Sequence, residues 1–389
     1  MKKTLLALAT LSAMAGSAFA ADVTLYGLVD YGFQYKHVDE TVNDAVDTFQ
    51  MKSGMNSGSR FGLKGSEDLG NGWKVGFVLE NGFDADDGTF DSNGDDKIFG
   101  REAQLYVQSA YGTLSFGRVG MLASANGSYG LLGMVSPFSS GWGDQTGVKY
   151  VTGGLWGRVD NAVTYVTPDF AGFKIYGQYT FKMDNSEKDI YGDAYDEGSA
   201  KVSKYYALAA TYSNGPLNLV LLGDVYDWGN VELTTRKWSK SIGNGYTATF
   251  GGSYDFGLMQ LYADVNYFHH VRVKDSLKGV HYEYIGKDND HTYMTDGWGG
   301  AIGVAIPMLG GNLKGSVGYR ENECIMNPDN DVERWSASIG YDYNLSKRTS
   351  VYTAATYAKD KFASMKAGYE EYVDDPQTIE VIAGLIHRF

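Results

Sequence analysis

Apolar and polar residues alternate with a period of two along most of the chain. In 23–30 the odd positions are apolar or glycine, whereas Thr24, Tyr26 and Asp30 occupy the opposite face. The C-terminal stretch 379–389 shows the same alternation. Alternation over roughly 8–12 residues is typical of β-strands with one apolar face. Helical spacing is largely absent, so the pattern predicts an all-β protein.

Connections of two lengths separate the predicted strands. The short ones are rich in the Gly, Asn and Asp that reverse turns need, and they are 67–72, 110–112, 168–172, 214–216, 255–258, 308–312 and 344–348. The long ones are mostly polar, and they are 37–52, 86–97, 120–158, 184–201, 228–245, 271–296, 322–332 and 361–376. Seven short turns that alternate with eight long loops require sixteen strands, with both chain ends on the short-turn side. This asymmetry is typical of transmembrane β-barrels.

A soluble sandwich and a membrane barrel share this alternation, and three features favour the barrel. Glycines are scattered within strands, which suits a strongly curved wall. The chain ends on an apolar strand at Phe389. Aromatic residues gather near strand ends, as interfacial girdles require, and the predicted members are Tyr26, Tyr31, Phe33, Tyr205, Tyr206, Tyr212, Tyr341, Tyr343 and Tyr352. A repeat propeller is disfavoured because no blade motif recurs.

Composition narrows the function classes. Glycine accounts for 51 of 389 residues without a Gly-x-y period, and only 6 residues are proline, so collagen-like and low-complexity chains are excluded. The net charge of −14 argues against a nucleic-acid partner, which needs clustered Lys and Arg. Cys324 is the single cysteine, which excludes an internal disulfide and multi-cysteine metal motifs.

The N-terminus has the features of a secretory signal peptide. Lys2 and Lys3 precede an apolar run, and 17–20 reads as a small-x-small cleavage site. We therefore expect residues 1–20 to be removed and 21–389 to form the mature barrel domain, with a net charge of −16. No later run of about 18 apolar residues predicts a transmembrane helix. The exported chain is then either soluble or a closed β-barrel.

Several segments resemble the Gram-negative general porins, particularly the β-proteobacterial type. The segments are 23–30 (VTLYGLVD), 59–72 (SRFGLKGSEDLGNG), 100–103 (GREA), 111–118 (YGTLSFGR), 344–349 (NLSKRT) and 384–389 (GLIHRF). The resemblance implies a homotrimeric, water-filled channel in the bacterial outer membrane, a 16-stranded antiparallel barrel with an infolded third loop. One departure is Ile386, where the family usually has a basic residue.

The expected function is passive diffusion of ions and small hydrophilic solutes. A substrate-specific channel is an alternative and would carry an aromatic track for its ligand. A non-conducting structural or adhesive barrel is another. Expected partners are two further copies of the chain, outer-membrane lipid and lipopolysaccharide. No cofactor or catalytic residue is predicted, since no nucleophile motif such as Gly-x-Ser-x-Gly stands out.

Residues 120–158 form the predicted constriction loop. The stretch is rich in glycine, serine and bulky apolar side chains, and 121–135 is compatible with a short helical turn. An apolar loop of this length would be costly in water, so it should pack against the inner wall. The alternative is an extracellular loop that stabilises the trimer.

Basic residues are expected on the wall opposite this loop. Alternation places Arg60 and Lys64 on the lumen face, and Lys74 follows the same rule. The resemblance implies that Arg60, Arg101 and Arg158 line the constriction. Alternation would turn Arg101 outward, so a bulge or an early strand end is expected there.

Two further charged residues complete the predicted neck. Arg118 flanks the long loop but shares the parity of apolar residues, so its direction is ambiguous. Asp144 is the only charged residue between 120 and 147. Basic wall residues that face a nearly neutral loop predict a mild preference for anions. Two features would favour cations instead: Asp30, Glu80 and Glu102 if they also line the lumen, and the acidic outer loops.

The sequence predicts no defined metal-binding site. The acidic stretch 84–96 lacks the EF-hand register, although a weakly bound surface divalent cation between acidic loops or lipopolysaccharide stays an alternative. Adjacent His269 and His270 should point to opposite faces of a strand and so should not share a metal. His281 and His291 lie in the same long loop.

Overall fold

The computed structural model describes residues 23–39, 44–90, 97–186, 195–229, 232–235, 238–241, 243–273, 294–325, 327–362, 365–367, 370–372 and 375–389. The predicted signal peptide, residues 91–96 of the acidic stretch, and both His281 and His291 lie outside these residues. None of the helices in the described ranges is long and apolar enough to span a membrane.

Antiparallel strands make up almost all of the regular structure. The strands of the main sheet are β1 (Thr24–Asp39), β2 (Val46–Ser53), β3 (Arg60–Gly70), β4 (Trp73–Gly82), β5 (Glu102–Ser109), β6 (Gly112–Gly120), β7 (Arg158–Val166), β8 (Phe173–Thr180), β9 (Lys204–Asn214), β10 (Leu217–Asp227), β13 (Gly245–Asp255), β14 (Gln260–Val271), β15 (Thr295–Met308), β16 (Gly311–Cys324), β17 (Asn327–Asn344), β18 (Thr349–Phe362) and β21 (Gln377–Arg388). Two separate hairpins are β11 (Glu232–Thr235) with β12 (Trp238–Ser241), and β19 (Met365–Ala367) with β20 (Glu370–Tyr372).

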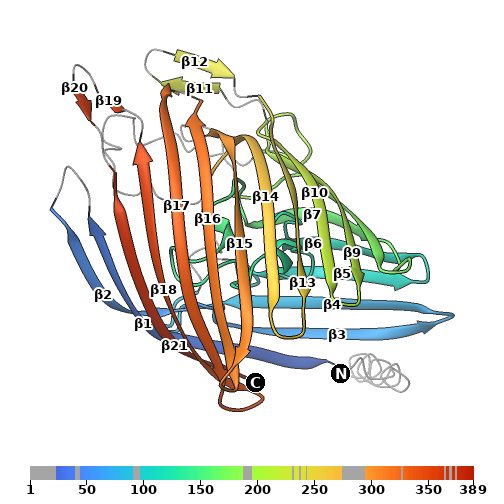
Figure 1. Ribbon diagram of the computed structural model, residues 1–389. Helices are drawn as coiled ribbons and strands as arrows, with labels where there is room; N and C mark the ends of the chain where they lie inside the picture. The colour runs from blue at the N-terminus through green and yellow to red at the C-terminus, as the bar shows by residue number, and fades with distance from the viewer. Residues whose placement is uncertain are drawn as a thin grey trace, which may run out of the picture.

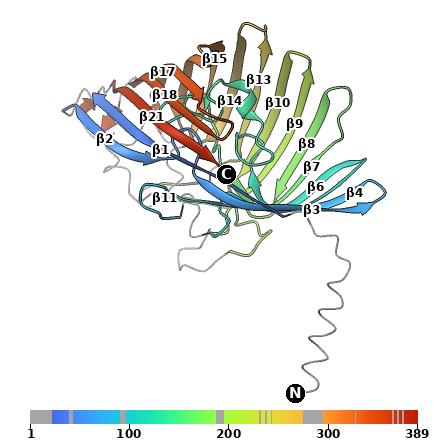
Figure 2. The same ribbon diagram turned by 90° about the horizontal axis from the view of Figure 1, so that it is seen from below.

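The main sheet closes on itself as a barrel (Figures 1 and 2). From β3 onward, each strand of the main sheet pairs with the next strand of that sheet, and β1 pairs with β21 from Leu28↔Arg388 to Asp39↔Gln377. Strands β2 and β3 both pair with β1 and are separated only by 54–59, so they form one interrupted wall strand. The closed wall therefore contains the predicted sixteen strands, and closure removes the exposed strand edges that a bilayer would not tolerate.

The seven short turns lie where the sequence predicts them. Asn71 and Gly72, for example, both adopt positive φ between β3 and β4. The predicted long loop 322–332 is wrong in its extent, because β16 and β17 continue as a ladder up to the pair Cys324↔Asn327. The predicted loop 37–52 is likewise mostly strand, since β1 and β2 pair up to Val38↔Val46. In both places polar strands extend the hairpin. Their polar composition resembles that of a loop, so the sequence pattern did not identify them as strands.

Side chains alternate between an apolar outer face and a polar inner face. On β1, Leu25 and Phe33 are exposed, whereas Asp30 and Gln34 are fully buried. This confirms the predicted alternation. The buried positions are polar because they face the lumen, where other polar groups and the third loop cover them.

Three of the tyrosines predicted for the aromatic girdles face inward instead. Each hydroxyl donates to a lumen-side carboxylate: Tyr26 to Glu80 (3.0 Å), Tyr205 to Asp224 (3.0 Å) and Tyr352 to Asp30 (2.6 Å). The prediction was wrong for these residues because neighbouring positions of a strand face opposite sides of the wall. A tyrosine side chain suits both sides, since its ring packs against apolar groups and its hydroxyl forms hydrogen bonds. Tyr206 and Tyr343 are exposed as predicted.

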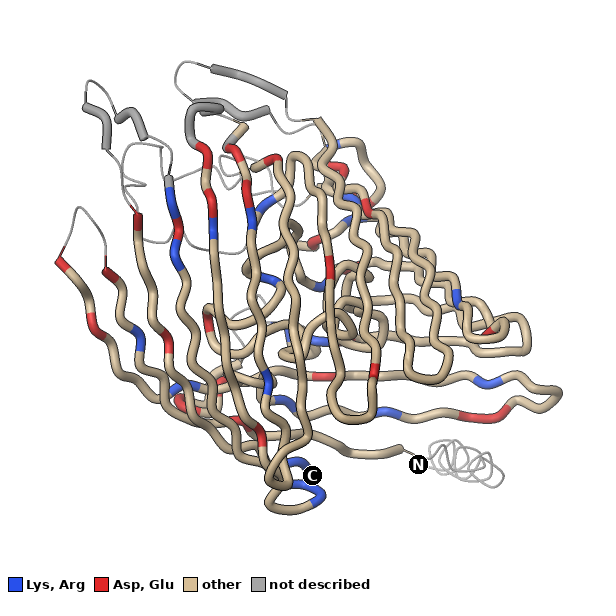
Figure 3. Tube along the Cα trace, in the orientation of Figure 1, with Lys and Arg blue, Asp and Glu red and all other residues tan. Residues whose placement is uncertain are grey.

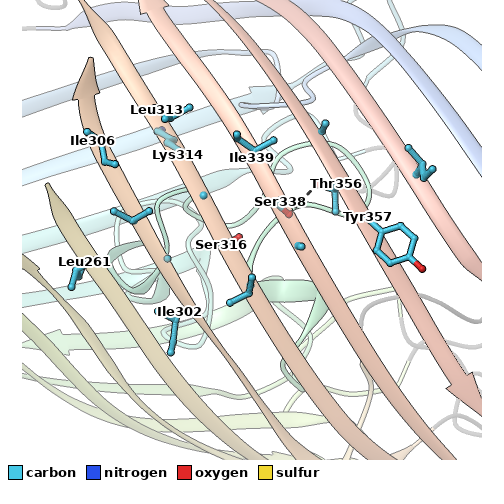
Figure 4. A pocket seen from close by; sticks show the side chains of 17 residues that line it. Leu261, Ile302, Ile306, Leu313, Lys314, Ser316, Ser338, Ile339, Thr356 and Tyr357 are labelled. Carbon is cyan, nitrogen blue, oxygen red and sulfur yellow. Dashed lines mark hydrogen bonds between the residues drawn. The ribbon is translucent and has the colours of Figure 1, made fainter. Parts of the chain in front are cut away.

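An apolar groove of about 860 Å³ lies over β14 to β18 and β21. Its rims include the exposed side chains Ile302, Ile339 and Tyr357, which Figure 4 shows along the strands. These side chains belong to the outer parity of the wall. The groove is thus a feature of the outer surface and not of the channel.

Charge is unevenly distributed along the barrel axis. Figure 3 shows acidic positions at the long-loop ends of the strands, and among them are Asp39, Asp44, Glu321, Glu323, Asp331 and Glu333. The turn between β17 and β18, at the opposite end, carries Lys347 and Arg348. This agrees with the expectation that acids populate the outer loops.

Candidate pore constriction

The loop between β6 and β7 folds into the barrel and packs against its inner wall. It contains two 3₁₀ turns, η2 (Leu132–Val135) and η3 (Val148–Tyr150), and the first confirms the helical turn predicted in 121–135. Two apolar clusters hold the loop. One joins it to β9, β10 and β14, with Met121, Leu122, Leu132, Val135, Tyr205, Leu222, Tyr226 and Phe268 among its members. The other consists of Leu28, Met55, Phe138, Trp142, Tyr352, Ala354, Ile382 and Ile386.

Ile386 packs in the second of these clusters with only 1% of its surface exposed. It sits on the lumen side of β21, where it pairs with Asp30 of β1. The apolar residue at this position contributes to the packing beneath the loop tip, beside Phe138 and Trp142.

Polar contacts fasten the loop to the wall along its length. The amide of Leu122 donates to Gln178 Oε1 (3.1 Å) on β8. On the return path, the amide of Gly153 donates to Asn266 Oδ1 (2.8 Å) on β14. Arg320 on β16 donates to the carbonyl of Tyr150 (2.9 Å). These contacts satisfy backbone groups that burial would otherwise leave unpaired.

The tip of the loop is tied to the strands at the barrel seam. Glu380 on β21 accepts the amide hydrogens of Asp144 (2.7 Å) and Gln145 (2.9 Å). The carboxylate of Asp144 accepts from Lys52 Nζ on β2 (2.6 and 2.7 Å) and from Gln34 Nε2 on β1 (3.1 Å). Contacts between residues so distant in sequence fix the position of the tip.

The charge of Asp144 is therefore matched by Lys52. Burial alone would raise the pKa of Asp144, but the charge and hydrogen bonds of Lys52, together with the amide of Gln34, hold that pKa below its usual range. The only acid of the 120–147 stretch is thus an anchor, paired with a cation of the wall.

Arg60 and Arg101 converge on one carboxylate. Arg101 Nε donates to Glu80 Oε1 (2.8 Å), and Arg60 Nη1 lies 3.7 Å from the same oxygen. Strand β5 begins only at Glu102, so Arg101 lies just outside the alternating strand and turns inward. This confirms the early strand end expected at that position.

Arg158 lies at the other foot of the loop, at the start of β7. Its Nη2 donates to Asn126 Oδ1 (3.5 Å) in the loop. The neighbouring carboxylate Glu102 accepts from the amide of Ser128 (3.2 Å), and Gly127 allows this turn with φ of +58°. The loop turn 126–128 therefore bridges one basic and one acidic wall residue.

Lys64 and Lys74 lie nearer the short-turn end of the wall than Glu80. Register places Lys64 opposite Val78, with its Nζ 5.1 Å from the centre of the Tyr26 ring. Lys74 lies opposite Asp68, beside the β3–β4 turn.

Arg118 belongs to a different network from Arg60 and Arg101. It pairs across strands with Ala103, and its Nη1 donates to Asp160 Oδ1 (2.6 Å). Lys97 bridges Asp160 and Asp184, at 3.3 Å to each. This network joins the feet of the second, third and fourth long loops.

Sequence reasoning missed Lys52 and Glu380, which hold the loop tip, and Arg334, which contacts Gln145. Each stands at an inward position of an alternating strand. The alternation of the sequence indicates that these residues face inward. Which of the inward-facing residues contact the third loop depends on the path of that loop through the barrel.

Comparison with known proteins agrees with this geometry. A sequence model of Gram-negative porins matches residues 6–363. An outer membrane porin of Bordetella pertussis is 31% identical, with all of both chains covered, and outer membrane porin protein 32 of Delftia acidovorans is 28% identical over 94% of this chain and 91% of its own.

Solved porin structures share the fold. An anion-selective porin from Comamonas acidovorans has a TM-score of 0.66 at 24% identity, over 95% of this chain and 100% of its own. OmpT of Vibrio cholerae has a TM-score of 0.56 at 15% identity, over 96% of this chain and 99% of its own.

A closed antiparallel barrel with an apolar exterior, a polar interior and a loop folded into the lumen defines a passive outer-membrane channel. The chain belongs to the Gram-negative porin family. It acts in the outer membrane as a diffusion channel, and the proteins it matches are channels rather than enzymes.

Proposed function

We propose that 21–389 forms a porin domain in which 120–158 constricts the lumen, with a neck that weakly favours small anions. The neck contains Arg60, Arg101 and Arg158. Two carboxylates, Glu80 and Glu102, stand beside these arginines. The three arginines concentrate positive charge at the wall beside the loop, and a narrow pore of low dielectric focuses the field of such charges.

The observation that carries this proposal is the shared carboxylate of Glu80. Arg60 and Arg101 approach the same oxygen of this carboxylate, so two guanidinium groups lie close together at one point of the wall. Within the stretch 120–147, the charge of Asp144 is paired with that of Lys52. Arg118 and Lys97 form ion pairs with Asp160 and Asp184, away from Glu80.

Acidic residues at the long-loop rim favour cations over anions. They raise the cation concentration at the outer mouth, but exposed charges are screened over about 8–10 Å in physiological salt. The neck is less screened, so its sign dominates the selectivity. One structurally similar protein, from Comamonas acidovorans, is named an anion-selective porin, and this supports the same preference here.

The remaining parts of the proposal concern assembly. We infer a homotrimer embedded in outer-membrane lipid and lipopolysaccharide. One solved structure of in-vitro folded OmpT of Vibrio cholerae, which is among the similar structures, is a trimer form. Small hydrophilic solutes and ions are the cargo, and the transport makes and breaks no covalent bond and uses no cofactor.

Reversal potentials in a KCl gradient test the selectivity. We expect the wild-type channel to pass chloride in modest preference to potassium, and R60Q/R101Q to lose or reverse that preference. Lys74→Gln, which removes one charge near the short-turn end, is the matched control and should change the potential less. A cation-selective wild type would overturn the proposed anion preference.

The same recordings separate the alternatives. A substrate-specific channel would show conductance blocked by one solute, whereas a structural or adhesive barrel would give no conductance steps. Heat-modifiable migration of the detergent-extracted protein reports whether the barrel and its trimer are intact.

A further inference from the structure

Strand β14 contains a bulge at its long-loop end. The register with β15 runs regularly to Phe268↔Gly297, and it shifts before the next pair, Val271↔Thr295. His270 lies in the bulge with φ of +49°, a left-handed conformation that is uncommon for a residue with a side chain. The shift is local, because β14 and β15 run side by side below it (Figure 1).

The bulge overturns the expectation that His269 and His270 point to opposite faces. Their rings stack with centroids 3.8 Å apart and planes inclined by 20°. One extra residue in a strand re-aims the following side chain, so the strict two-residue alternation used in the sequence argument fails at this position.

Asp296 on β15 faces both rings. Its Oδ2 lies 2.9 Å from His269 Nδ1 and 3.9 Å from His270 Nε2. Its Oδ1 accepts the backbone amide hydrogen of His270 (2.6 Å) and so fixes the carboxylate against the bulge. The three possible ligand atoms all lie within 4.8 Å of one another.

This donor set suits a borderline divalent metal ion. Two imidazole nitrogens and one carboxylate oxygen are ligands for Zn²⁺, Ni²⁺ and Cu²⁺, whereas Ca²⁺ and Mg²⁺ prefer oxygen donors alone. Ligand atoms about 2.0–2.2 Å from one ion are at most about 4.4 Å apart. A small side-chain rotation therefore brings the three atoms to bonding distance.

The surroundings leave the cluster accessible but partly shielded. All three side chains are between one fifth and one third exposed. The ring of Tyr246 on β13 packs on His269 at 4.8 Å between centroids, and Trp228 Nε1 donates to the carbonyl of His270 (3.0 Å). These contacts stabilise the bulge, so the side chains of the three possible ligands lose little conformational freedom when a metal ion binds.

We propose that His269, His270 and Asp296 form a binding site for a transition-metal dication such as Zn²⁺ at the outer rim of the barrel. Solvent water completes the coordination shell. The ion ties β14 to β15 at the base of the loop that joins them, and it is independent of the neck of the channel.

Zn²⁺ titration of the chelator-treated, detergent-solubilised trimer by isothermal calorimetry tests this site. We expect saturable binding at one ion per chain. H269A, H270A and D296N should each weaken the affinity by about tenfold or more, because each removes a ligand. His387→Ala, which changes an exposed histidine at the opposite end of the barrel, should bind as wild type.

A second probe reports the ligands directly. The Cu²⁺ electron paramagnetic resonance spectrum of the wild type should show coupling to two nitrogens, and H269Q should show one. Heat-modifiable migration verifies that each variant still forms the barrel.

Three outcomes would overturn the proposal. One is the absence of saturable Zn²⁺ binding to the folded wild type. Another is unchanged affinity in H269A and D296N. The third is binding abolished by H281A/H291A but untouched by D296N, which would assign the ion to other histidines.

Discussion

Nε of Arg101 lies 2.8 Å from Oε1 of Glu80, the oxygen that Arg60 also approaches at 3.7 Å. Arg101 precedes β5, whereas Glu80 belongs to β4, so a strand end and a strand interior meet at this contact. Two guanidinium groups therefore lie beside one carboxylate at the proposed neck.

Neutralising that carboxylate should increase anion selectivity. For Glu80→Gln we expect the chloride-to-potassium permeability ratio to rise roughly twofold or more, since a charge in a narrow pore shifts the potential by about kT or more. Reversal potentials in a KCl gradient measure the ratio. Glu67→Gln, at the exposed short-turn end of β3, is the control, and a shift toward cations in E80Q would contradict the charge assignment.

Removing the carboxylate that holds the loop tip should loosen the loop. Glu380→Ala deletes the acceptor for the amides of Asp144 and Gln145, and hydrogen bonds to charged groups contribute about 1.5–3 kcal/mol each. We expect noisier single-channel currents and a lower melting temperature. Glu333→Ala, at the rim, should leave the current noise unchanged, and a quiet E380A channel would show that the tip is held elsewhere.

The ion pair at the loop tip should persist in mild acid. The folded-state pKa of Asp144 lies below its unfolded value, so its stabilising effect is present above about pH 4 and is lost as the pH falls through the lowered pKa. We expect the stability difference between wild type and D144N to be constant from about pH 7 to 5 and to shrink in stronger acid. Denaturant unfolding at several pH values measures it, and a difference that vanished already near pH 6 would refute the lowered pKa.

A methyl group beneath the loop should displace it. A Cβ at Gly299 on β15 would collide with the carbonyl of Val151 in the loop, whereas the Cβ position at Gly177 on β8 meets nothing within 4 Å. We therefore expect Gly299→Ala to change single-channel conductance and lower stability by roughly 1–3 kcal/mol. Gly177→Ala should leave both unchanged, and equal effects of the two substitutions would show that loop contact is not the cause.

Several features of the barrel followed from local patterns. The alternation at 23–30 and 379–389, and turn residues such as Asn71 and Gly72, were sufficient to predict the strand number and the outer and inner faces. Local patterns failed where the backbone departs from regular strand geometry. The bulge at His270 reversed the expected direction of a side chain. The polar ends of β16 and β17, beyond residue 322, were predicted to be a loop although they are paired strands.

The candidate neck was predictable only in part. Arg60 follows from the parity of its strand, whereas the inward direction of Arg101 depends on where β5 begins. That Asp144 meets Lys52 was not foreseen, because the residues are 92 positions apart and belong to a loop and a strand on different parts of the wall.

The sequence by itself determined that this protein is a sixteen-stranded membrane barrel with both ends on the short-turn side, because strand periodicity and turn chemistry are local properties of the chain. The tertiary structure alone decided which charges share a carboxylate, where the third loop is anchored, and that two adjacent histidines face the same aspartate. Those relationships depend on barrel closure, strand register and a single bulge, which bring distant residues together and have no local signature in the sequence.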